Sequence, residues 1–208
     1  MANNNHLIDK YIDALLVEAA LRKNELNSET ITTVYLGGGT PSLLSITQLS
    51  KLVNGLKKVF DFSDLEEFTI EVNPDDVTAY YIQQAKSLGI NRVSMGVQSF
   101  SDEDLRFINR RHTAKQATDA IDNIKETGID NISIDLIYGI PGQNFEIWKN
   151  NVDTAISLSV QHISAYTLMY EEGTRLSVMR SLGIITEVDD DVVAVMYDYL
   201  VAQLKSNG

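Results

Sequence analysis

The 208 residues include 29 acidic and 17 basic side chains, giving a net charge of −12, and 44% are hydrophobic. This composition is ordinary for a globular protein of one domain, and its negative surface argues against nucleic acid as a partner. No apolar run reaches the roughly 20 residues that cross a bilayer. The polar start lacks the regions of a signal peptide, so we expect a cytoplasmic protein without a transmembrane segment.

Alternating helix and strand patterns follow an amphipathic helix expected over residues 7–26. The predicted strands are Ile31–Leu36, Glu67–Val72, Arg92–Val97, Asn131–Ile137 and His162–Thr167. The predicted helices between and after them are Ile46–Phe60, Val77–Leu88, Asp102–Ile108, Ala114–Thr127, Phe145–Leu158 and Glu187–Leu204. Repeated strand–helix units with short connections indicate a parallel sheet.

Apolar and polar side chains alternate along these strands. Central strands of an open sheet covered on both faces would instead be nearly continuous apolar runs. The polar set, which includes Glu71, Gln98 and Asp135, is therefore expected to line a concavity, with the apolar set packed on helices. Burying Glu71 or Asp135 without a partner is costly, so a polar ligand or cation is expected near them.

The stretch VYLGGGTPS at residues 34–42 places three glycines directly after a strand. Glycine lets backbone adopt left-handed conformations and approach a ligand closely. The carboxyl ends of parallel strands are where such folds bind ligands. The stretch has no GxGxxG spacing, which disfavours a nicotinamide cofactor. A plain strand-to-helix turn is the alternative interpretation.

The sequence contains no cysteine. The chain therefore cannot form disulfides, thiolate nucleophiles or metal sites held by thiolates. His6, His112 and His162 show no metal-ligand spacing, so no metal site is predicted, and His112 is expected to form surface hydrogen bonds only. Trp148 lies on an amphipathic stripe and is predicted to be core.

Five motifs, taken together and in this order, resemble the radical S-adenosylmethionine (radical SAM) enzymes related to oxygen-independent coproporphyrinogen III oxidase. Within that group the chain is most similar to the HemW-type haem chaperone branch. The motifs are YLGGGTPSLL, TIEVNPDD, GVQSFSDEDLRFINRRH, ISIDLIYGIPGQ and SAYTLMYEEGT.

The resemblance implies an α/β fold, a partial (β/α)6 TIM-like barrel of parallel strands whose first strand and cluster loop are missing. Residues 1–208 would then form a single truncated radical SAM domain. The full-length parent would bind a 4Fe–4S cluster and S-adenosylmethionine and act in haem (porphyrin) metabolism. The oxidase branch decarboxylates porphyrinogen propionates oxidatively, whereas the HemW-type branch binds haem and passes it to acceptor proteins.

The glycine motif and the following strand carry four of the cofactor contacts that the resemblance implies. Gly38, Gly39 and Thr40 would contact the methionine amino group, which suits an ammonium that needs carbonyl or hydroxyl acceptors. Glu71 matches a carboxylate that helps to bind the cofactor. Its alternative interpretation is a sheet carboxylate paired with a lysine or arginine.

The later motifs carry the remaining contacts. Gln98 and Asp135 match positions that bind the ribose hydroxyls. Arg110 matches the arginine that pairs with the methionine carboxylate, with Arg111 as the competing candidate. Met169 falls where the family supplies backbone contacts to adenine. No catalytic residue is assigned.

The family's CxxxCxxC loop, which supplies the cluster thiolates, has no counterpart here. We therefore expect this chain to hold no cluster and to be inactive, the enzyme being its full-length parent, an oxidoreductase similar to coproporphyrinogen dehydrogenase. The alternative is a cluster-independent haem-binding or haem-transfer protein. A generic barrel lyase or isomerase is a third reading, weakened by the lack of an inward lysine. Without its first strand, the sheet edge could pair two chains into a dimer.

Overall fold

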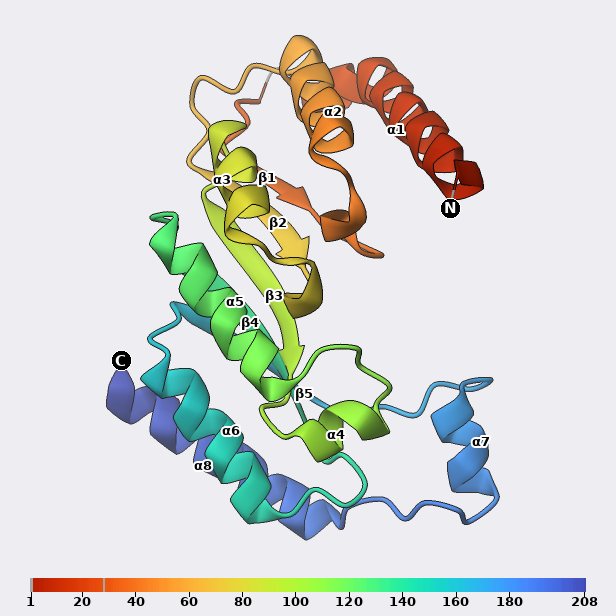
Figure 1. The fold of residues 1–208 in the computed structure, drawn as a ribbon, viewed down its shortest axis with the longest axis vertical. Coiled ribbons are helices and arrows are strands. Elements are labelled where there is room, and N and C mark those ends of the chain that lie inside the picture. The colour runs from red at the N-terminus through yellow and green to blue at the C-terminus, as the bar shows by residue number, and fades with distance from the viewer. Residues whose placement is uncertain (1, 28) are drawn as a thin grey trace. The chain divides into compact units, whose positions relative to one another are not determined.

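The structure, a computed structural model, describes residues 2–27 and 29–208, with side chains from residue 6 onward. Figure 1 shows its strands and helices alternating along the chain. The strands are β1 (Thr33–Leu36), β2 (Glu67–Val72), β3 (Arg92–Gln98), β4 (Asn131–Tyr138) and β5 (His162–Thr167). The α-helices are α1 (Ala2–Arg22), α2 (Ile46–Val59), α3 (Ala79–Ser87), α4 (Asp102–Phe107), α5 (Ala114–Glu126), α6 (Phe145–Ser157), α7 (Arg175–Ser181) and α8 (Asp190–Asn207). Three short 3-10 helices are η1 (Lys23–Leu26), η2 (Pro41–Leu43) and η3 (Pro74–Asp76).

The strands form one open sheet in the order β1-β2-β3-β4-β5, and the pairs β1–β2 and β4–β5 are parallel. This confirms the predicted α/β class with a parallel sheet. By contacts the chain divides into two compact units, residues 1–94 with 123–131 and residues 95–122 with 132–208. Among the described residues, none of the helices combines the length and the apolar character needed to cross a bilayer.

The predicted alternation of the strands is confirmed in part. In the first unit Phe68 and Ile70 are fully buried, whereas Glu71 is half-buried. In the second unit Ile134 and Leu136 are fully buried and Asp135, between them, is half-buried. The apolar sides of the strands thus form the core, and the polar sides are accessible only toward the carboxyl ends, because Thr69, Ser94 and Ser133 are buried as well.

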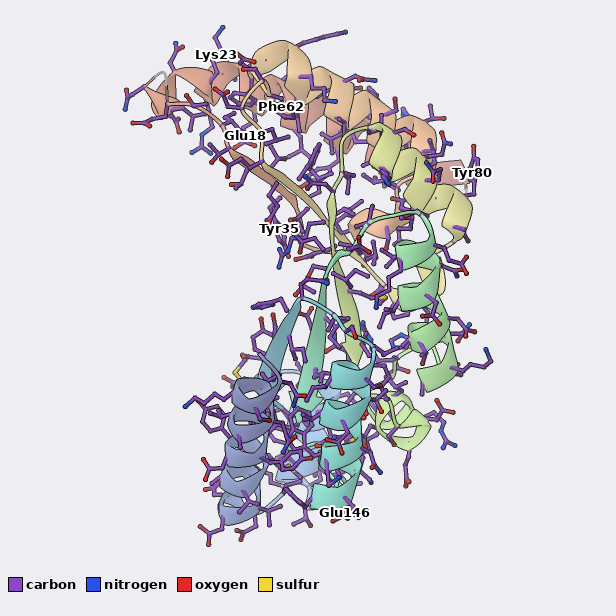
Figure 2. The ribbon with its side chains drawn as sticks, turned by 90° about the vertical axis from the view of Figure 1, so that its left-hand side faces the viewer. Glu18, Lys23, Tyr35, Phe62, Tyr80 and Glu146 are labelled. Carbon is purple, nitrogen blue, oxygen red and sulfur yellow. The ribbon has the colours of Figure 1, made fainter. Side chains whose placement is uncertain are left out.

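In the first unit α1 packs on α2. Ile12 of α1 is buried, and a side chain at Gly55 of α2 would collide with Leu16, so glycine lets the two helices approach closely. The predicted apolar stripe of α1 is only partly right, because Leu7 and Tyr11 are 63% and 64% exposed. On β1, Tyr35 points away from the helices that cover the other face of the strands (Figure 2).

In the second unit α6 lies beside α8 (Figure 1). The Trp148 ring is fully buried, and its Nε1 donates to the Met196 carbonyl of α8 at 2.8 Å. The prediction that Trp148 belongs to the core is therefore confirmed. The α6–α8 pair is also joined by the Tyr199 hydroxyl, which donates to Asp153 at 2.7 Å.

Several element ends differ from the prediction. Helix α1 begins at Ala2, and α8 begins at Asp190, where the Asp189 side chain accepts from the Asp191 N–H at 2.9 Å. Helix α7, Arg175–Ser181, was not predicted, and none of its residues is buried. A short exposed helix lacks the apolar periodicity on which sequence prediction depends.

Candidate functional site

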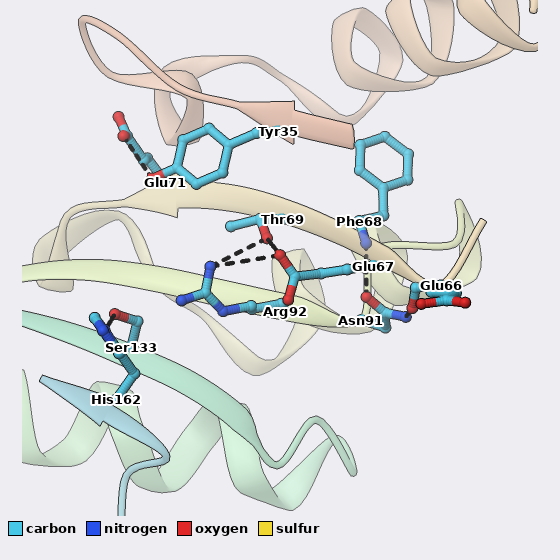
Figure 3. A network of polar contacts seen from close by, with 10 residues as sticks. All are labelled: Tyr35, Glu66, Glu67, Phe68, Thr69, Glu71, Asn91, Arg92, Ser133 and His162. Atoms are coloured by element: carbon cyan, nitrogen blue, oxygen red, sulfur yellow. Dashed lines mark hydrogen bonds and ion pairs between the residues drawn. The ribbon is translucent and has the colours of Figure 1, made fainter. Parts of the chain in front are cut away.

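The glycine turn after β1 is built around the carboxylate of Glu71 on β2. The Gly38 N–H donates to Glu71 Oε2 at 2.9 Å, and the Tyr35 hydroxyl donates to Glu71 Oε1 at 2.8 Å. Figure 3 shows the Tyr35 and Glu71 side chains together beside the two strands. The structure therefore brings the first two motifs together at the carboxyl ends of β1 and β2.

The three glycines of this turn are required for different reasons. Gly38 and Gly39 have φ values of +80° and +63°, a left-handed region that other residues enter at a cost. Gly37 is needed for space, because a Cβ there would collide with the Tyr35 ring and lie 2.8 Å from Glu71 Oε1. The triplet is therefore fitted to Glu71, and the interpretation as a plain turn does not account for Gly37.

The exit from the turn is tied to the end of β2. The Ser42 hydroxyl donates to Asp76 Oδ2 at 2.7 Å and accepts from the Asn73 N–H at 3.2 Å. Thr40 precedes Pro41, the first residue of η2. Sequence reasoning missed Ser42 and Asp76, although both lie inside motifs that it identified.

This corner of the first unit offers acceptors suited to an ammonium. Each oxygen of Glu71 accepts one hydrogen bond within the described residues, and a carboxylate has about four acceptor positions. The carbonyls of the glycine turn and the Thr40 hydroxyl are acceptors of the same kind. The alternative interpretation of Glu71 as an ion-paired sheet carboxylate is not what the structure shows, because its described partners are a hydroxyl and an amide.

In the second unit, Gln98 ends β3 in an unusual conformation. Its φ is +69°, and the Ser99 N–H donates back to the Val97 carbonyl at 2.9 Å. A three-residue turn with a positive φ at its centre is the pattern of the classic γ-turn, which is rare and strained. Strain of this kind is concentrated at functional sites.

The INRRH stretch folds back onto the same strand. Arg110 Nη2 donates to the Gly96 carbonyl at 2.7 Å, and His112 Nε2 lies 2.9 Å from the Val97 carbonyl. The expectation that His112 is a surface residue was wrong: it is only 3% exposed, because its ring is held against the end of β3. Arg111, by contrast, is exposed, so the geometry separates the two arginines.

Asp135 and Met169 lie on neighbouring parts of the second unit. Asp135 is half-buried in β4 and is in register with Ser164 of β5. Met169 follows β5 and is 70% exposed, and the preceding residue, Leu168, donates its N–H to the Tyr138 carbonyl at 2.9 Å. The backbone around Met169 is thus anchored at the carboxyl end of β4 while its side chain is free of packing.

A buried polar network behind β3 escaped sequence reasoning. Ser99, Asp104, Gln143 and Asn151 are all at most 3% exposed and are joined by hydrogen bonds. Asp104 belongs to an acidic first helical turn, DED, which in sequence is typical of solvated charges that favour a helix start. No local pattern distinguishes it from Asp102 and Glu103.

The model of the Radical SAM superfamily matches residues 5–155. The chain belongs to the radical SAM superfamily. It is 37% identical to "Heme chaperone HemW" of Lactococcus lactis over 97% of this chain and 52% of that protein, and 35% identical to the Bacillus subtilis "Heme chaperone HemW" over 97% and 53%. The chain thus spans about half the length of these radical SAM relatives.

Among solved structures, the radical SAM enzyme HemN, a coproporphyrinogen III oxidase from Escherichia coli, is similar with a TM-score of 0.84. The two share 26% identity, covering 98% of this chain and 46% of HemN. The predicted family, a HemW- or HemN-like radical SAM protein, is therefore confirmed. An archaeal Elp3 from Methanocaldococcus infernus, 21% identical with a TM-score of 0.70, shares the fold.

Radical SAM proteins combine S-adenosylmethionine with a 4Fe–4S cluster, and the two groups fit this chain differently. Because the 208 residues contain no cysteine, the chain itself offers none of the thiolates that hold such clusters. The acceptors around Glu71, in contrast, fit the ammonium of a methionine moiety.

Proposed function

We propose that this chain forms the S-adenosylmethionine-binding portion of a HemW-like radical SAM protein that acts in haem metabolism. The observation that carries the proposal is Glu71, whose oxygens are oriented by Gly38 and Tyr35 at the carboxyl end of a parallel strand. Relatives that cover almost all of this chain are named haem chaperones, which supports the link to haem.

In the first unit we assign the methionine ammonium to Glu71, together with acceptors of Gly38, Gly39 and Thr40. A carboxylate held by two fixed donors keeps its remaining lone pairs directed, so the ammonium meets a prepared set of acceptors.

In the second unit we assign the ribose hydroxyls to Gln98 and Asp135, which are both acceptors on half-buried strand positions. Arg110 is the candidate for the methionine carboxylate, because its guanidinium, anchored through one Nη to Gly96, is the planar donor group that suits a carboxylate. The exposed stretch at Met169 is assigned to adenine through its backbone.

Isothermal titration calorimetry with S-adenosylmethionine tests the proposal. Glu71→Gln keeps the shape of the side chain and removes its charge, and we expect the affinity to fall by about tenfold or more. Glu67→Gln is the matched control, since Glu67 lies on the same face of β2 but is ion-paired with Arg92 at 3.6 Å (Figure 3). Equal affinities for the unmutated 208-residue chain and for Glu71→Gln would contradict the proposal, as would no binding to the unmutated chain.

A second candidate is a cluster-independent haem-binding or haem-transfer protein. It is favoured by the names of the relatives, since a chaperone of haem needs to hold the porphyrin. Titration of the chain with haemin, followed by its Soret absorption, tests this candidate. A saturable spectral change that S-adenosylmethionine does not alter would favour haem binding independent of the cofactor, and an unchanged spectrum would contradict it.

A further inference from the structure

The turn at Gln98 is strained, yet its side-chain amide has no hydrogen-bond partner in the part of the chain that the structure describes. The residue is neither glycine nor asparagine, the usual occupants of this backbone region. A strained conformation persists only where the surroundings enforce it. On the preceding side Arg110 and His112 contact the Gly96 and Val97 carbonyls, and the residues that follow Gln98 supply the rest of that enforcement.

Two buried side chains hold the residues after the turn. Ser99 is fully buried; its hydroxyl donates to Asp104 Oδ2 at 2.7 Å and accepts from the Ser101 N–H at 3.0 Å. Asn151 of α6 accepts from the Phe100 N–H at 2.7 Å and donates to the Ser99 hydroxyl at 3.0 Å. The backbone from residue 99 to 101 is thereby fixed from α4 and α6.

Asp104 also reaches the end of the next strand. Gln143 Nε2 donates to the same oxygen, Asp104 Oδ2, at 2.7 Å, and Gln143 Oε1 accepts from the Gly139 N–H at 3.0 Å. Gly139 directly follows β4, the strand that carries Asp135. One carboxylate thus links the ends of the two strands that carry Gln98 and Asp135.

The chemistry of this link is unusual for a purely structural core. Asp104 is 3% exposed, and its described side-chain partners are a hydroxyl and an amide rather than a cation. Burying a carboxylate is costly, and well-packed apolar residues commonly serve stability as well or better. A carboxylate that accepts two convergent donors does fix the position of both, which an apolar side chain cannot do.

We infer that Asp104 is a positioning residue, which acts through Ser99 and Gln143 to hold Gln98 in its turn and to set Gln98 and Asp135 for one ligand. This inference rests on the proposed function, because the ligand it concerns is the ribose of S-adenosylmethionine. Asp104 itself is only 3% exposed, so the inference gives it no direct contact with the ligand.

The test is a double-mutant cycle on S-adenosylmethionine affinity, measured by calorimetry on the full chain. Asp104→Asn should weaken binding about fivefold in the unmutated chain and by clearly less in the Gln98→Ala background, where only the part that acts through Asp135 remains, because coupled residues are non-additive. Additive losses would overturn the inference. Val152→Ala, a buried truncation on α6, is the control for general destabilisation and should leave the affinity unchanged.

A double variant in which residues 104 and 143 exchange their side-chain groups tests whether the loss of affinity can be reversed. In Asp104→Asn/Gln143→Glu the amide at residue 104 can donate to the carboxylate at residue 143, which still accepts from the Gly139 N–H, so this half of the link is kept. The donating amide cannot also accept from the Ser99 hydroxyl, so affinity should recover in part relative to Asp104→Asn alone. Failure of the rescue would count against positioning through this link. If Asp104→Asn does not fold, Ser99→Ala removes the Ser99–Asp104 half of the link and leaves the Asp104–Gln143 hydrogen bond in place, so it should give a smaller loss of affinity that is non-additive with Gln98→Ala.

Amide hydrogen exchange without ligand separates this inference from the proposed function. Asp104→Asn should raise exchange at Ser99, Phe100 and Gly139 by about tenfold or more, with little change where β4 pairs with β5. Ser99→Ala in its place should raise exchange at Ser99 and Phe100 only, because the Gly139 amide stays held by Gln143. Unchanged protection at those three amides in Asp104→Asn would overturn the inference even if the unmutated chain binds S-adenosylmethionine. If the unmutated chain does not bind S-adenosylmethionine, the proposed function fails. Faster exchange at those amides in the variant would still support the link through Asp104.

Discussion

Tyr35 and Glu71 meet beside the glycine turn, with the phenol hydroxyl donating to Glu71 Oε1 at 2.8 Å. Tyr35 is 53% exposed, and its ring fills the space where a side chain at residue 37 would lie. An exposed tyrosine that orients a carboxylate is unexpected if the strand served packing alone. The pair links the shape of the glycine turn to the charge that we assign to ligand binding.

Removing the Tyr35 hydroxyl should therefore weaken ligand binding without a large effect on folding. We expect Tyr35→Phe to reduce S-adenosylmethionine affinity about three- to tenfold, because one of two donors that orient the carboxylate is lost. Calorimetry gives the affinity and a thermal melt gives the stability. Tyr80→Phe, on an exposed tyrosine of α3, is the control and should change neither.

Gly37→Ala should displace Tyr35 and Glu71, because its Cβ would overlap both side chains. We expect a larger loss of affinity than for Tyr35→Phe, since both the carboxylate and its donor move. Gly183→Ala is the control: Gly183 has a φ of +66° with open space around its Cβ position. That change should cost about 1 kcal/mol of folding free energy and leave the affinity unchanged, and a loss as large as that of Gly37→Ala would contradict the steric account.

Gln98→Gly should make the protein more stable and its ligand binding weaker. Glycine adopts the φ of +69° without strain, so we expect a gain of about 1 kcal/mol in the free energy of unfolding. The loss of the amide should at the same time lower the affinity for S-adenosylmethionine. Denaturant unfolding and calorimetry measure the two effects.

Asn109→Gly is the matched control for this prediction, since Asn109 has a φ of +58° and directly follows Ile108, the C-cap of α4. Asparagine tolerates this region better, so the gain in stability should be smaller, and the affinity should not change. A Gln98→Gly protein that is less stable than the parent would show that the turn is not strained.

Much of the fold could be predicted because its signals are local. The bounds of β2 and β5 were predicted correctly, since period-two alternation is contained within each strand. Gly89 and Gly128 follow predicted helices directly, and both have the positive φ values that favour glycine at a helix end. Helix α7 was missed because it is stabilised by the Thr174 cap rather than by an apolar stripe.

The parts of the site that lie within sequence motifs could be predicted. The parts that depend on contacts between residues distant in sequence could not. The glycine turn and Glu71 were identified from sequence, and the structure brings them to hydrogen-bond distance. The burial of His112 depends on a carbonyl 15 residues earlier, and Asp104 is joined to a glutamine 39 residues later. Contacts at such separations leave no periodic trace in the sequence.

Tyr81 gives a prediction about pH that is independent of the ligand. Its hydroxyl on α3 is buried and has no hydrogen-bond partner among the described residues, and burial, with a smaller effect of Asp76, raises the pKa of Tyr81 to about 12. A phenol whose pKa is higher in the folded than in the unfolded state contributes stability that is fully present below pH 10. That contribution is lost as the pH rises from 10 towards 12.

Tyr81→Phe should therefore make the fall in unfolding free energy between pH 10 and 12, the alkaline limb of the stability profile, less steep. At neutral pH the variant should be at least as stable as the parent, because the buried hydroxyl makes no hydrogen bond that would be lost. Denaturant midpoints measured between pH 7 and 12 check both statements, with Tyr80→Phe, an exposed tyrosine of the same helix, as the control. An alkaline limb that is equally steep in Tyr81→Phe would show that other groups cause the loss, and a clear destabilisation at pH 7 would show that the hydroxyl is paired after all.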